Sequence, residues 1–518
     1  MVTRIHNSSG ASGVKETAQK AAHKVQKDVR RAVAGTLGMN GQRMSKVDTA
    51  WLRMDSASNL MMIVGVWTLK PQVSYDALSE RVEGTLLKFR RFKQRVVEDS
   101  AGATWVDDKQ FDISKHIIVE KLPKVAKHKE VLGQEQSALQ DRVAELAMQP
   151  LDPRRPLWQL HLIEDYDGGS VLIVRIHHCI ADGIALIAVS MSMVDGGPKP
   201  PERKAKVEKR GGLEGAEDWI AGTLIKSLTQ LAVKTLGKTG DGFSNSLEML
   251  ADPKQGMNNT VHMAKIAYQL ASDAAALVLM PDDSPTRLKG KPGTTKKVAW
   301  CQPIPLDEVK AVGKALNCSL NDVLLSCVAG AIGEYLRALG DNTKGQEIRA
   351  MVPVNLRPLD QAHKLGNNFG LVPLVLPIGV ENPIERVYEV RRRMGALKGS
   401  MQPLLAFGML AVAGTLVKPA QEALLNLFSK KTTAVMTNVP GPKEKLKFCG
   451  STLEQSLFWV PQSGSVGLGV SILSYGGGVQ FGIISDATLC PDPQKIIDEF
   501  EPEFAKLSIV TLMLPWGE

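Results

Sequence analysis

Residues 171–183, VLIVRIHHCIADG, carry the side chains with the clearest capacity for chemistry. The aliphatic run from Val171 to Ile176 predicts a buried strand, and two consecutive histidines, His177 and His178, follow it. Imidazole, with an ordinary pKa near ~6.5, can accept a proton at neutral pH. Neighbouring residues of a strand point to opposite faces of the sheet. We therefore predict that one histidine is the reagent and the other is scaffolding.

Two other interpretations of the histidine pair start from the same residues. In a metal site, both imidazoles and the Asp182 carboxylate would converge on one ion. The opposite directions of His177 and His178 disfavour that arrangement, so no metal ligand is predicted. In a purely structural interpretation, the histidines pack at a strand end and Asp182 forms a turn with Gly183.

A hairpin is predicted to hold the histidine-bearing strand. Residues 157–164 alternate between apolar and polar side chains, residues 165–169 have turn composition, and residues 170–177 form the returning strand. The hairpin places Trp158 and His178 in one local unit. Elsewhere, helical patterns cover residues 76–88, 130–149, 306–316, 319–339 and 386–397, and strand patterns cover residues 60–69, 89–99, 371–378 and a glycine-bearing hairpin at 476–478.

The composition indicates a large globular protein. With 518 residues, 44% of them hydrophobic, the chain can fill two or more cores. The six cysteines include no CxxC pair, which favours a reducing, cytoplasmic setting without disulfides. Most of the net charge of +9 belongs to residues 1–46, where nine Lys or Arg side chains outnumber Glu16 and Asp28. Because aromatic residues make up only 5% and no nucleic-acid motif appears, no nucleic-acid partner is predicted.

Composition shifts divide the chain into four parts. Residues 1–43 form a basic extension that is either an amphipathic helix or disordered, and residues 44–195 form a first globular unit. Residues 196–297 read as a linker and helical connection, and residues 298–518 form a second unit. The longest apolar run, residues 404–417, is shorter than the roughly 20 residues of a membrane span. It is predicted to be a buried helix or a helix at a membrane face.

The string HHxxxDG resembles the motif of the CoA-dependent acyltransferase superfamily, which includes chloramphenicol acetyltransferase, condensation domains and carnitine acyltransferases. Six more strings extend the likeness: PLW at 156–158, SLND at 319–322, MVPVNLRP at 351–358, GNNFG at 366–370, TNVPGP at 437–442 and FWVPQSG at 458–464. Together, and in this order, they resemble the bacterial wax ester synthase/diacylglycerol acyltransferase family from about residue 44 to residue 504.

The resemblance implies an α/β fold in which two chloramphenicol-acetyltransferase-like domains with mixed sheets meet at a central tunnel. It implies roles for seven residues: His178 as general base, His177 in positioning, Asp182 as a structural anchor paired with an arginine, Asn321 as a possible oxyanion stabiliser, and Gly183, Trp158 and Asn438 in substrate binding. Other interpretations stay open. Ser319 and Asp322 match a helix capping box, Asn438 lies in a turn-forming string and is expected to be structural more than catalytic, and Trp158 is either a core aromatic or a wall of the acyl channel.

The expected activity is O-acyl transfer from acyl-CoA to a lipid alcohol, which makes triacylglycerol from diacylglycerol, wax ester from a long-chain alcohol, or both. Acyl-CoA is then a substrate, and no cofactor is expected. We expect a cytoplasmic protein in peripheral contact with the inner face of the membrane or with lipid inclusions. The alternatives are a related acyltransferase with another acceptor and a non-catalytic protein that binds lipid inclusions.

Overall fold

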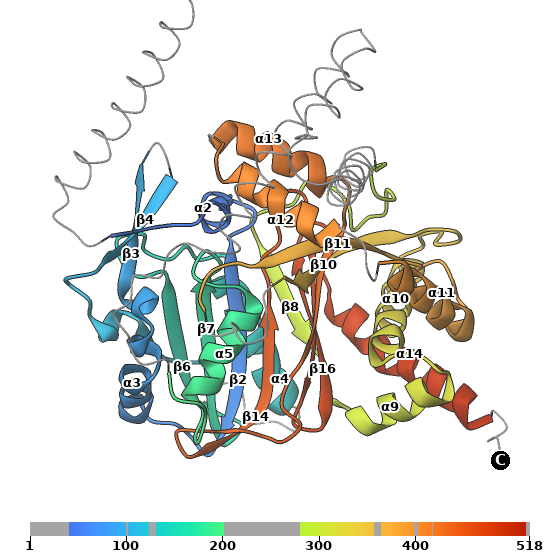
Figure 1. Cartoon of the computed structure of the whole chain (residues 1–518). Coiled ribbons are helices and arrows are strands. Elements are labelled where there is room, and N and C mark those ends of the chain that lie inside the picture. Colours follow the sequence, from blue (N-terminus) through green and yellow to red (C-terminus); the bar gives the residue numbers. More distant parts are fainter. Residues whose placement is uncertain are drawn as a thin grey trace, which may run out of the picture.

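A computed structural model describes residues 41–99, 102–123, 131–200, 280–356, 364–397, 402–416 and 418–513 (Figure 1). The predicted basic extension, up to residue 40, and residues 201–279 of the predicted connection lie outside the described residues. Within the described part, the two predicted α/β units are present, each built on a sheet.

The first sheet has six strands in the order β13-β14-β2-β7-β6-β5. Their bounds are β2 (Met62–Lys70), β5 (Ile117–Lys121), β6 (Trp158–Tyr166), β7 (Gly169–His177), β13 (Lys447–Phe448) and β14 (Ser451–Trp459). The predicted hairpin is confirmed, because β6 and β7 pair antiparallel across a tight turn in which Asp167 and Gly168 have positive φ. The β7 strand runs in the middle of this sheet and ends at His177.

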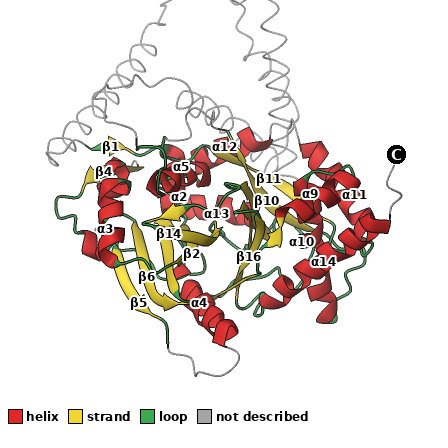
Figure 2. Cartoon of the chain, turned by 90° about the horizontal axis from the view of Figure 1, so that it is seen from below, coloured by secondary structure: helices red, strands yellow, loops and turns green. Residues whose placement is uncertain are grey.

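Helices cover both faces of the first sheet (Figure 2). The helix α4 (Val131–Ala147) packs on one face, and α3 (Tyr75–Gly84) and α5 (Gly183–Met193) pack on the other. The helix predicted for residues 76–88 is shorter than expected, since a short 3-10 turn, Leu86–Lys88, replaces its end. The strand predicted for residues 89–99 likewise begins with a 3-10 turn, Arg90–Lys93. A third 3-10 turn spans Ile113–Lys115, and a small sheet has the order β1 (Gln42–Arg43), β4 (Gly102–Asp107) and β3 (Gln94–Asp99).

The second sheet has seven strands, ordered β11-β10-β12-β15-β16-β8 with β9 beside β16. The bounds are β8 (Lys296–Trp300), β9 (Ile304–Pro305), β10 (Ile348–Asn355), β11 (Phe369–Leu376), β12 (Ala434–Pro440), β15 (Leu468–Tyr475) and β16 (Gly478–Asp486), with helices α9 (Leu306–Ala315), α10 (Leu320–Ala338), α11 (Pro383–Leu397) and α14 (Gln494–Met513). The helices share one buried apolar core with the sheet. Both sheets contain parallel as well as antiparallel pairs, so the predicted mixed α/β architecture is confirmed.

The second unit contributes two strands to the sheet of the first, which a division of the chain at residue 298 does not predict. The strands β13 and β14 belong to the second unit by sequence, yet β14 pairs antiparallel with β2 of the first sheet. Its other neighbours are β15 and β16, and Trp459 of β14 lies 5.9 Å, ring to ring, from Trp300 of β8. The strand β14 therefore connects the two halves, because it pairs with the first sheet and packs against strands of the second.

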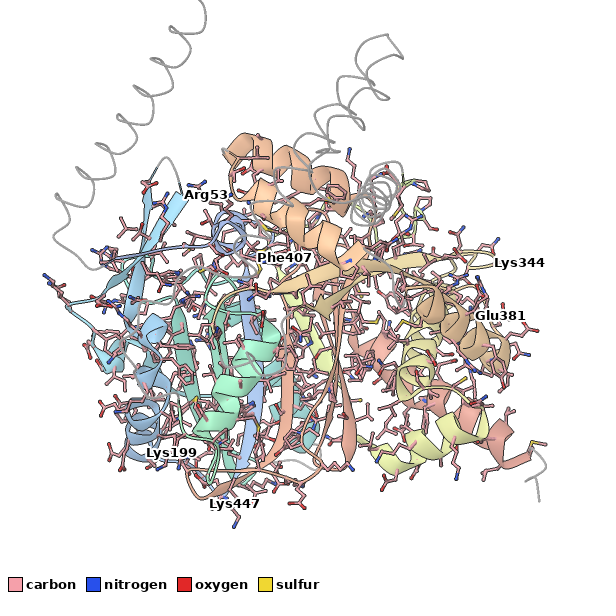
Figure 3. The ribbon with its side chains drawn as sticks, viewed as in Figure 1. Arg53, Lys199, Lys344, Glu381, Phe407 and Lys447 are labelled. Carbon is pink, nitrogen blue, oxygen red and sulfur yellow. The ribbon has the colours of Figure 1, made fainter. Side chains whose placement is uncertain are left out.

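The apolar run predicted at residues 404–417 forms most of α12 (Gln402–Ala413), which is followed by α13 (Lys418–Ser429). Figure 3 shows Phe407 inside the molecule, and Phe407 and Met409 are buried. The fit against α2 (Lys46–Arg53) is close, since a Cβ at Gly414 would lie 1.8 Å from the Lys46 carbonyl oxygen. For the described side chains, the buried-helix interpretation is confirmed.

Among the described residues, no single helix has the length and apolar character to cross a bilayer. The helices α9 and α10 pass such a test only as a pair, and they bend by 100° at the break between them.

Candidate active site

His178 lies just beyond the end of β7, enclosed by parts of both units. Its backbone N–H donates to the Met61 carbonyl oxygen at 2.7 Å, which continues the pairing of β7 with the chain before β2. The imidazole stacks on the indole of Trp51, with ring centroids 4.2 Å apart and planes 17° from parallel. Phe369 of β11 lies 5.5 Å away on a tilted plane. The ring is therefore held by two aromatic side chains, one from each half of the protein.

Burial dominates the protonation of His178. Removal from water lowers the pKa of the imidazole to about 4, because the charged form loses its hydration. The carbonyl group of His178 itself and the Asn367 amide act in the opposite direction but only in part, and the nearby His177 adds to the lowering. At neutral pH the ring is uncharged and can accept a proton.

His177 points away from His178, as the strand geometry predicts. Its Nδ1 atom accepts the backbone N–H of Cys179 at 3.1 Å, and its Nε2 atom lies 3.4 Å from the Asp55 carboxylate. Burial acts to lower the pKa of the His177 imidazole, but Cys179 and the Asp55 carboxylate outweigh it and raise the pKa to about 10. His177 thereby ties the loop after β7 to the loop before β2.

Asp182 caps α5 and links the two units. One carboxylate oxygen accepts the Ala185 N–H at 2.9 Å, and the other accepts the Asn368 N–H at 2.9 Å. Its own N–H donates to the Gly366 carbonyl oxygen at 3.2 Å. These bonds place Asp182 as an anchor between the HHxxxDG and GNNFG strings, while its pairing with an arginine stays a prediction.

Replacement of Asp182 by asparagine should lower the melting temperature and the activity together. Asparagine offers one acceptor oxygen where two buried N–H groups need one each, and an unpaired buried donor costs roughly 1–3 kcal/mol. Thermal denaturation and an acyl-transfer assay on the same preparation measure both effects. The matched control is Asp112→Asn, because Asp112 caps a 3-10 turn in the same manner but at the surface. A variant of Asp182 with native stability and no activity would contradict the anchoring role.

Gly183 has a different role from the tight turn that the sequence suggests. It is the first residue of α5 and does not have a positive φ, so its backbone conformation is open to other residues. A Cβ at this position would meet no heavy atom within 4 Å. The glycine leaves open space directly beside the cavity that His178 lines.

A cavity of about 250 Å³ adjoins His178 between the two units. It is lined by Trp51, His178, Asp182, Gly183, Ile184, Pro353, Asn355, Phe369, Leu371, Val435, Thr437, Asn438, Val439, Pro440, Phe458, Val460, Pro461 and Ser463. The wall is mostly apolar, with the imidazole, the Asp182 carboxylate and a few amide and hydroxyl groups. A mostly apolar wall with a few polar groups is typical of small-molecule binding sites.

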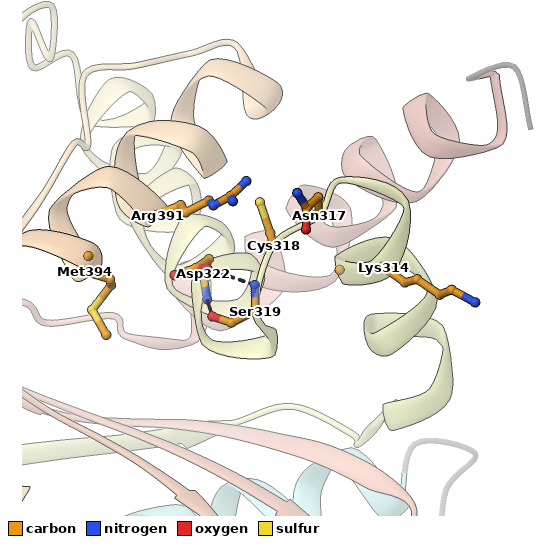
Figure 4. A pocket seen from close by; sticks show the side chains of 9 residues that line it. Lys314, Asn317, Cys318, Ser319, Asp322, Arg391 and Met394 are labelled. Carbon is orange, nitrogen blue, oxygen red and sulfur yellow. Dashed lines mark hydrogen bonds between the residues drawn. The ribbon is translucent and has the colours of Figure 1, made fainter. Parts of the chain in front are cut away.

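Asn438 lies in the wall of this cavity, whereas Asn321 contacts it from the start of α10. The Asn438 Nδ2 atom donates to the Asn321 Oδ1 atom at 3.0 Å. The neighbouring Ser319 and Asp322 form the capping box that the sequence allows, with the Ser319 N–H donating to the Asp322 carboxylate at 2.8 Å (Figure 4). The capping pair lines a separate hollow of about 490 Å³ beside α11. His178 is not one of the residues that line this hollow.

Trp158 is a core aromatic. It is fully buried, its indole N–H donates to the Phe92 carbonyl oxygen at 2.8 Å, and its ring stacks on His116 at 4.4 Å. It is not one of the residues that line the cavity beside His178. The PLW string thus supports the hairpin that carries the histidines and contributes no side chain to the cavity wall.

Three residues near His178 escape the sequence analysis: Trp51, Asp48 and Asn367. The Asn367 Nδ2 atom donates to the His178 carbonyl oxygen at 2.7 Å and to the Asp48 carboxylate at 2.8 Å. Burial raises the pKa of Asp48, with the nearby Arg91 opposing. Two sequence features bear on this cluster: an acidic residue three positions before a tryptophan in KVDTAW, and the paired asparagines of GNNFG. Neither signal names its partner.

Comparison with known sequences concerns the family of the chain. The family described as the wax ester synthase/diacylglycerol acyltransferase catalytic domain matches residues 44–324, and the WS/DGAT C-terminal domain matches residues 365–508. A probable diacylglycerol O-acyltransferase of Mycobacterium tuberculosis is 26% identical over 449 residues, which cover 85% of this chain and 89% of that protein. Wax ester synthase/diacylglycerol acyltransferase 8 of Arabidopsis thaliana is 25% identical over 481 residues, 85% of this chain and 90% of that protein.

Comparison with solved structures concerns the fold. The wax ester synthase/diacylglycerol acyltransferase from Marinobacter aquaeolei VT8 superposes with a TM-score of 0.61 at 19% identity, covering 91% of this chain and 99% of that one. The condensation domain of the Monacolin K polyketide synthase MokA gives a TM-score of 0.52 at 11% identity, over 92% and 98% of the two chains. With family matches over both halves and the HHxxxDG histidine in a cavity between them, the chain belongs to the wax ester synthase/diacylglycerol acyltransferase family of O-acyltransferases.

Proposed function

We propose that this O-acyltransferase moves a fatty acyl group from acyl-CoA to a lipid alcohol, with His178 as the general base. The acceptor is diacylglycerol, a long-chain alcohol, or both. The observation that carries the proposal is an uncharged, buried imidazole in the wall of a largely apolar cavity that both units line. Relatives named for diacylglycerol acyltransfer and wax ester synthesis support the choice of acceptors.

The chemistry follows from what the imidazole can do. An alcohol is a weak nucleophile, so His178 takes its proton as the oxygen attacks the thioester carbon. The tetrahedral intermediate collapses by breaking the carbon–sulfur bond, and the CoA thiolate leaves with the proton that His178 returns. The stack on Trp51 holds the imidazole in one orientation throughout. The proton therefore moves over a short distance, from the alcohol oxygen to the imidazole and then to the thiolate sulfur.

The negative charge on the intermediate needs hydrogen-bond donors. Asn438 lines the cavity, and its bond to Asn321 fixes the direction of both amide groups. We assign the stabilisation of the oxyanion to this amide pair, with Asn438 nearer to the reacting carbonyl. A single donor of this kind commonly contributes about 10²- to 10³-fold in rate.

The direct test is a transfer assay with purified protein, radiolabelled palmitoyl-CoA and separate offers of hexadecanol and diolein. Labelled wax ester or triacylglycerol, separated by thin-layer chromatography, is the expected product. The His178→Ala variant is the matched control for transfer that does not depend on the base. If neither hexadecanol nor diolein gives labelled product while a small hydrophilic alcohol is acylated, the result would favour a related acyltransferase with another acceptor. Binding of lipid without transfer to any alcohol would favour the non-catalytic alternative.

The acid side of the pH profile should report the low pKa of His178. Since the free enzyme holds this group's pKa near about 4, kcat/KM should stay level as pH falls through the ordinary histidine range and decline only near the lower value. Stability should change at a higher pH than the rate does. The unfolded chain binds a proton on this histidine at a pKa near ~6.5, whereas the folded protein does not, so the free energy of unfolding falls as pH drops below that value. Steady-state rates and denaturant titrations across the same buffers measure both. An acid limb centred near the ordinary histidine pKa would contradict the assignment.

Contact with a lipid surface is the remaining part of the proposal, and it rests on the sequence of residues 1–46 with its excess of seven positive charges. We place the enzyme in the cytoplasm, at the inner face of the membrane or on lipid inclusions, where insoluble products can leave directly into lipid. Removal of residues 1–43 should reduce binding to anionic vesicles at low salt more than at high salt, because the attraction is screened within about 8–10 Å. Liposome flotation of the full-length and shortened proteins across a salt series measures this. Equal, salt-independent binding of both proteins would refute it.

A further inference from the structure

A second, apolar chamber lies beside the His178 cavity, beneath α5. One face of α5 forms its roof, at the helical positions Gly183, Leu186, Ile187, Ser190 and Met191, and Val194 continues it directly after the helix. At a rise of 1.5 Å per residue, this roof is about 16 Å long. The residues that line the chamber, all in the described part of the chain, include no charged side chain. The hydroxyl of Tyr475 is already engaged, donating to the Leu453 carbonyl oxygen at 2.8 Å.

The chamber and the His178 cavity share part of their walls. Gly183, Val439, Pro440, Phe458 and Val460 line both. Gly183 occupies the junction on the α5 side, and the free space around its position means that no side chain closes the passage there. The two hollows therefore adjoin at Gly183, with no side chain of that residue between them.

The floor of the chamber contains another glycine. Every second residue of a strand points to the same face, so residues 63, 65 and 67 share one face of β2. Ile63, Gly65 and Trp67 all line the chamber. Gly65 pairs with Val174 of β7, one step further from His178 than the pair of Ile63 with Ile176. A Cβ at Gly65 would make only ordinary contacts, the nearest at 3.5 Å from the Leu457 carbonyl oxygen. A Cβ at position 65 therefore meets no backbone clash, and a larger side chain built on it would extend toward the chamber midway along its floor.

From this geometry we infer that the chamber binds the linear hydrocarbon chain of one substrate and that Gly65 sets the length of chain it accepts. The inference rests on the proposed acyl transfer, since it takes the reacting carbon to lie at His178. An elongated space that has no charged lining residue and adjoins the His178 cavity fits a saturated chain. It would exclude the polar parts of either substrate. The same hydrocarbon chemistry is present in the acyl donor and in the alcohol acceptor, and the two sources are separable by experiment.

The test replaces Gly65 with valine and measures kcat/KM in two series. In the first series, octanoyl-, lauroyl- and palmitoyl-CoA are compared with hexadecanol as the fixed acceptor. In the second, octanol, dodecanol and hexadecanol are compared with palmitoyl-CoA as the fixed donor. We expect the longest chain of one series to lose at least about tenfold relative to the shortest, because a few methylene groups in an apolar pocket discriminate by that much or more. The series that shifts identifies the chain in the chamber.

Gly133→Val is the matched control, since Gly133 is exposed on α4 and a Cβ there meets nothing within 4 Å. It should leave both series unchanged. Melting temperatures establish that each variant is folded, and Gly65→Ala, with a smaller loss for the longest chain, serves if the valine variant is not. Unchanged length preference in both series for a folded Gly65→Val protein would overturn the inference.

A second measurement separates this inference from the proposed reaction. Fluorescence of cis-parinaric acid reports chain binding without turnover. If the wild-type protein transfers no acyl group but binds the probe, and Gly65→Val weakens that binding at least about tenfold while Gly133→Val does not, the chamber stands and only the reaction fails. Equal probe binding by wild type and Gly65→Val would overturn the chamber itself.

Discussion

Replacement of His178 by alanine is expected to lower kcat/KM for acyl transfer by roughly 10²- to 10⁴-fold with the fold intact. The ring makes no side-chain hydrogen bond through Nδ1 among the described residues, and its surroundings are the apolar faces of Trp51 and Phe369. Its removal therefore deprives the cavity of a base and leaves neighbouring polar groups unchanged. Initial rates with palmitoyl-CoA and hexadecanol, normalised to folded protein, measure the loss.

His177→Ala separates chemistry from support. Without the imidazole, the Cys179 N–H loses its acceptor in the interior, and the loop after β7 loses its tie to Asp55. We expect this variant to melt at a lower temperature and to keep a measurable rate. Free imidazole added to the His178→Ala protein should restore part of the rate, since the space beside Trp51 then matches the missing ring. Wild-type turnover by His178→Ala would remove His178 from the mechanism.

Removal of Arg386 should have the largest effect on stability, at about 3–5 kcal/mol. Arg386 and Glu503 form an ion pair in the second core, each with 1% of its side chain exposed. The guanidinium also donates to the Ser326 carbonyl oxygen at 3.0 Å and to that of Val380 at 2.9 Å. In Arg386→Met, the Glu503 carboxylate keeps only its bond to Lys506 among the described contacts, inside an apolar core. Denaturant unfolding, followed by circular dichroism, measures the change.

Two further variants make this expectation specific. Arg392→Met removes a surface arginine that pairs with Glu389, and it should change stability little because that pair is solvated. Arg386→Met combined with Glu503→Leu removes both buried charges and should recover part of the loss. A single Arg386→Met variant as stable as the Arg392 control would show that the buried pair contributes no net stability.

Local sequence patterns predict the elements that carry the site. The β6–β7 hairpin, the strand at residues 60–69 and the capping box of α10 all follow from alternation, turn composition or a spacing of three residues. The opposite directions of His177 and His178 follow from strand geometry alone. Each of these features depends on contacts between residues that are near in sequence, which is why the chain shows them without its fold.

The environment of His178 depends on contacts that local patterns do not encode. Trp51 reaches the imidazole from a helix far earlier in the chain, and Asn367 reaches it from the second unit. The role of Gly183 also changes with the fold, since a turn and an open passage require the same absence of a side chain. Trp158 shows the converse: its position beside the histidines in the hairpin suggests a cavity wall, but the side chain points into the core.

The pairing of β14 with β2 has a consequence for the order in which the protein is made. A ribosome completes β2, β7 and both histidines long before it reaches residues 451–459, so the sheet that carries His178 has an open edge during most of translation. The residues of the cavity wall at Val439, Phe458 and Val460 are synthesised in the same late interval. The nascent chain therefore holds His178 beside an unfinished cavity, and the cavity wall is complete only once the polypeptide is nearly finished.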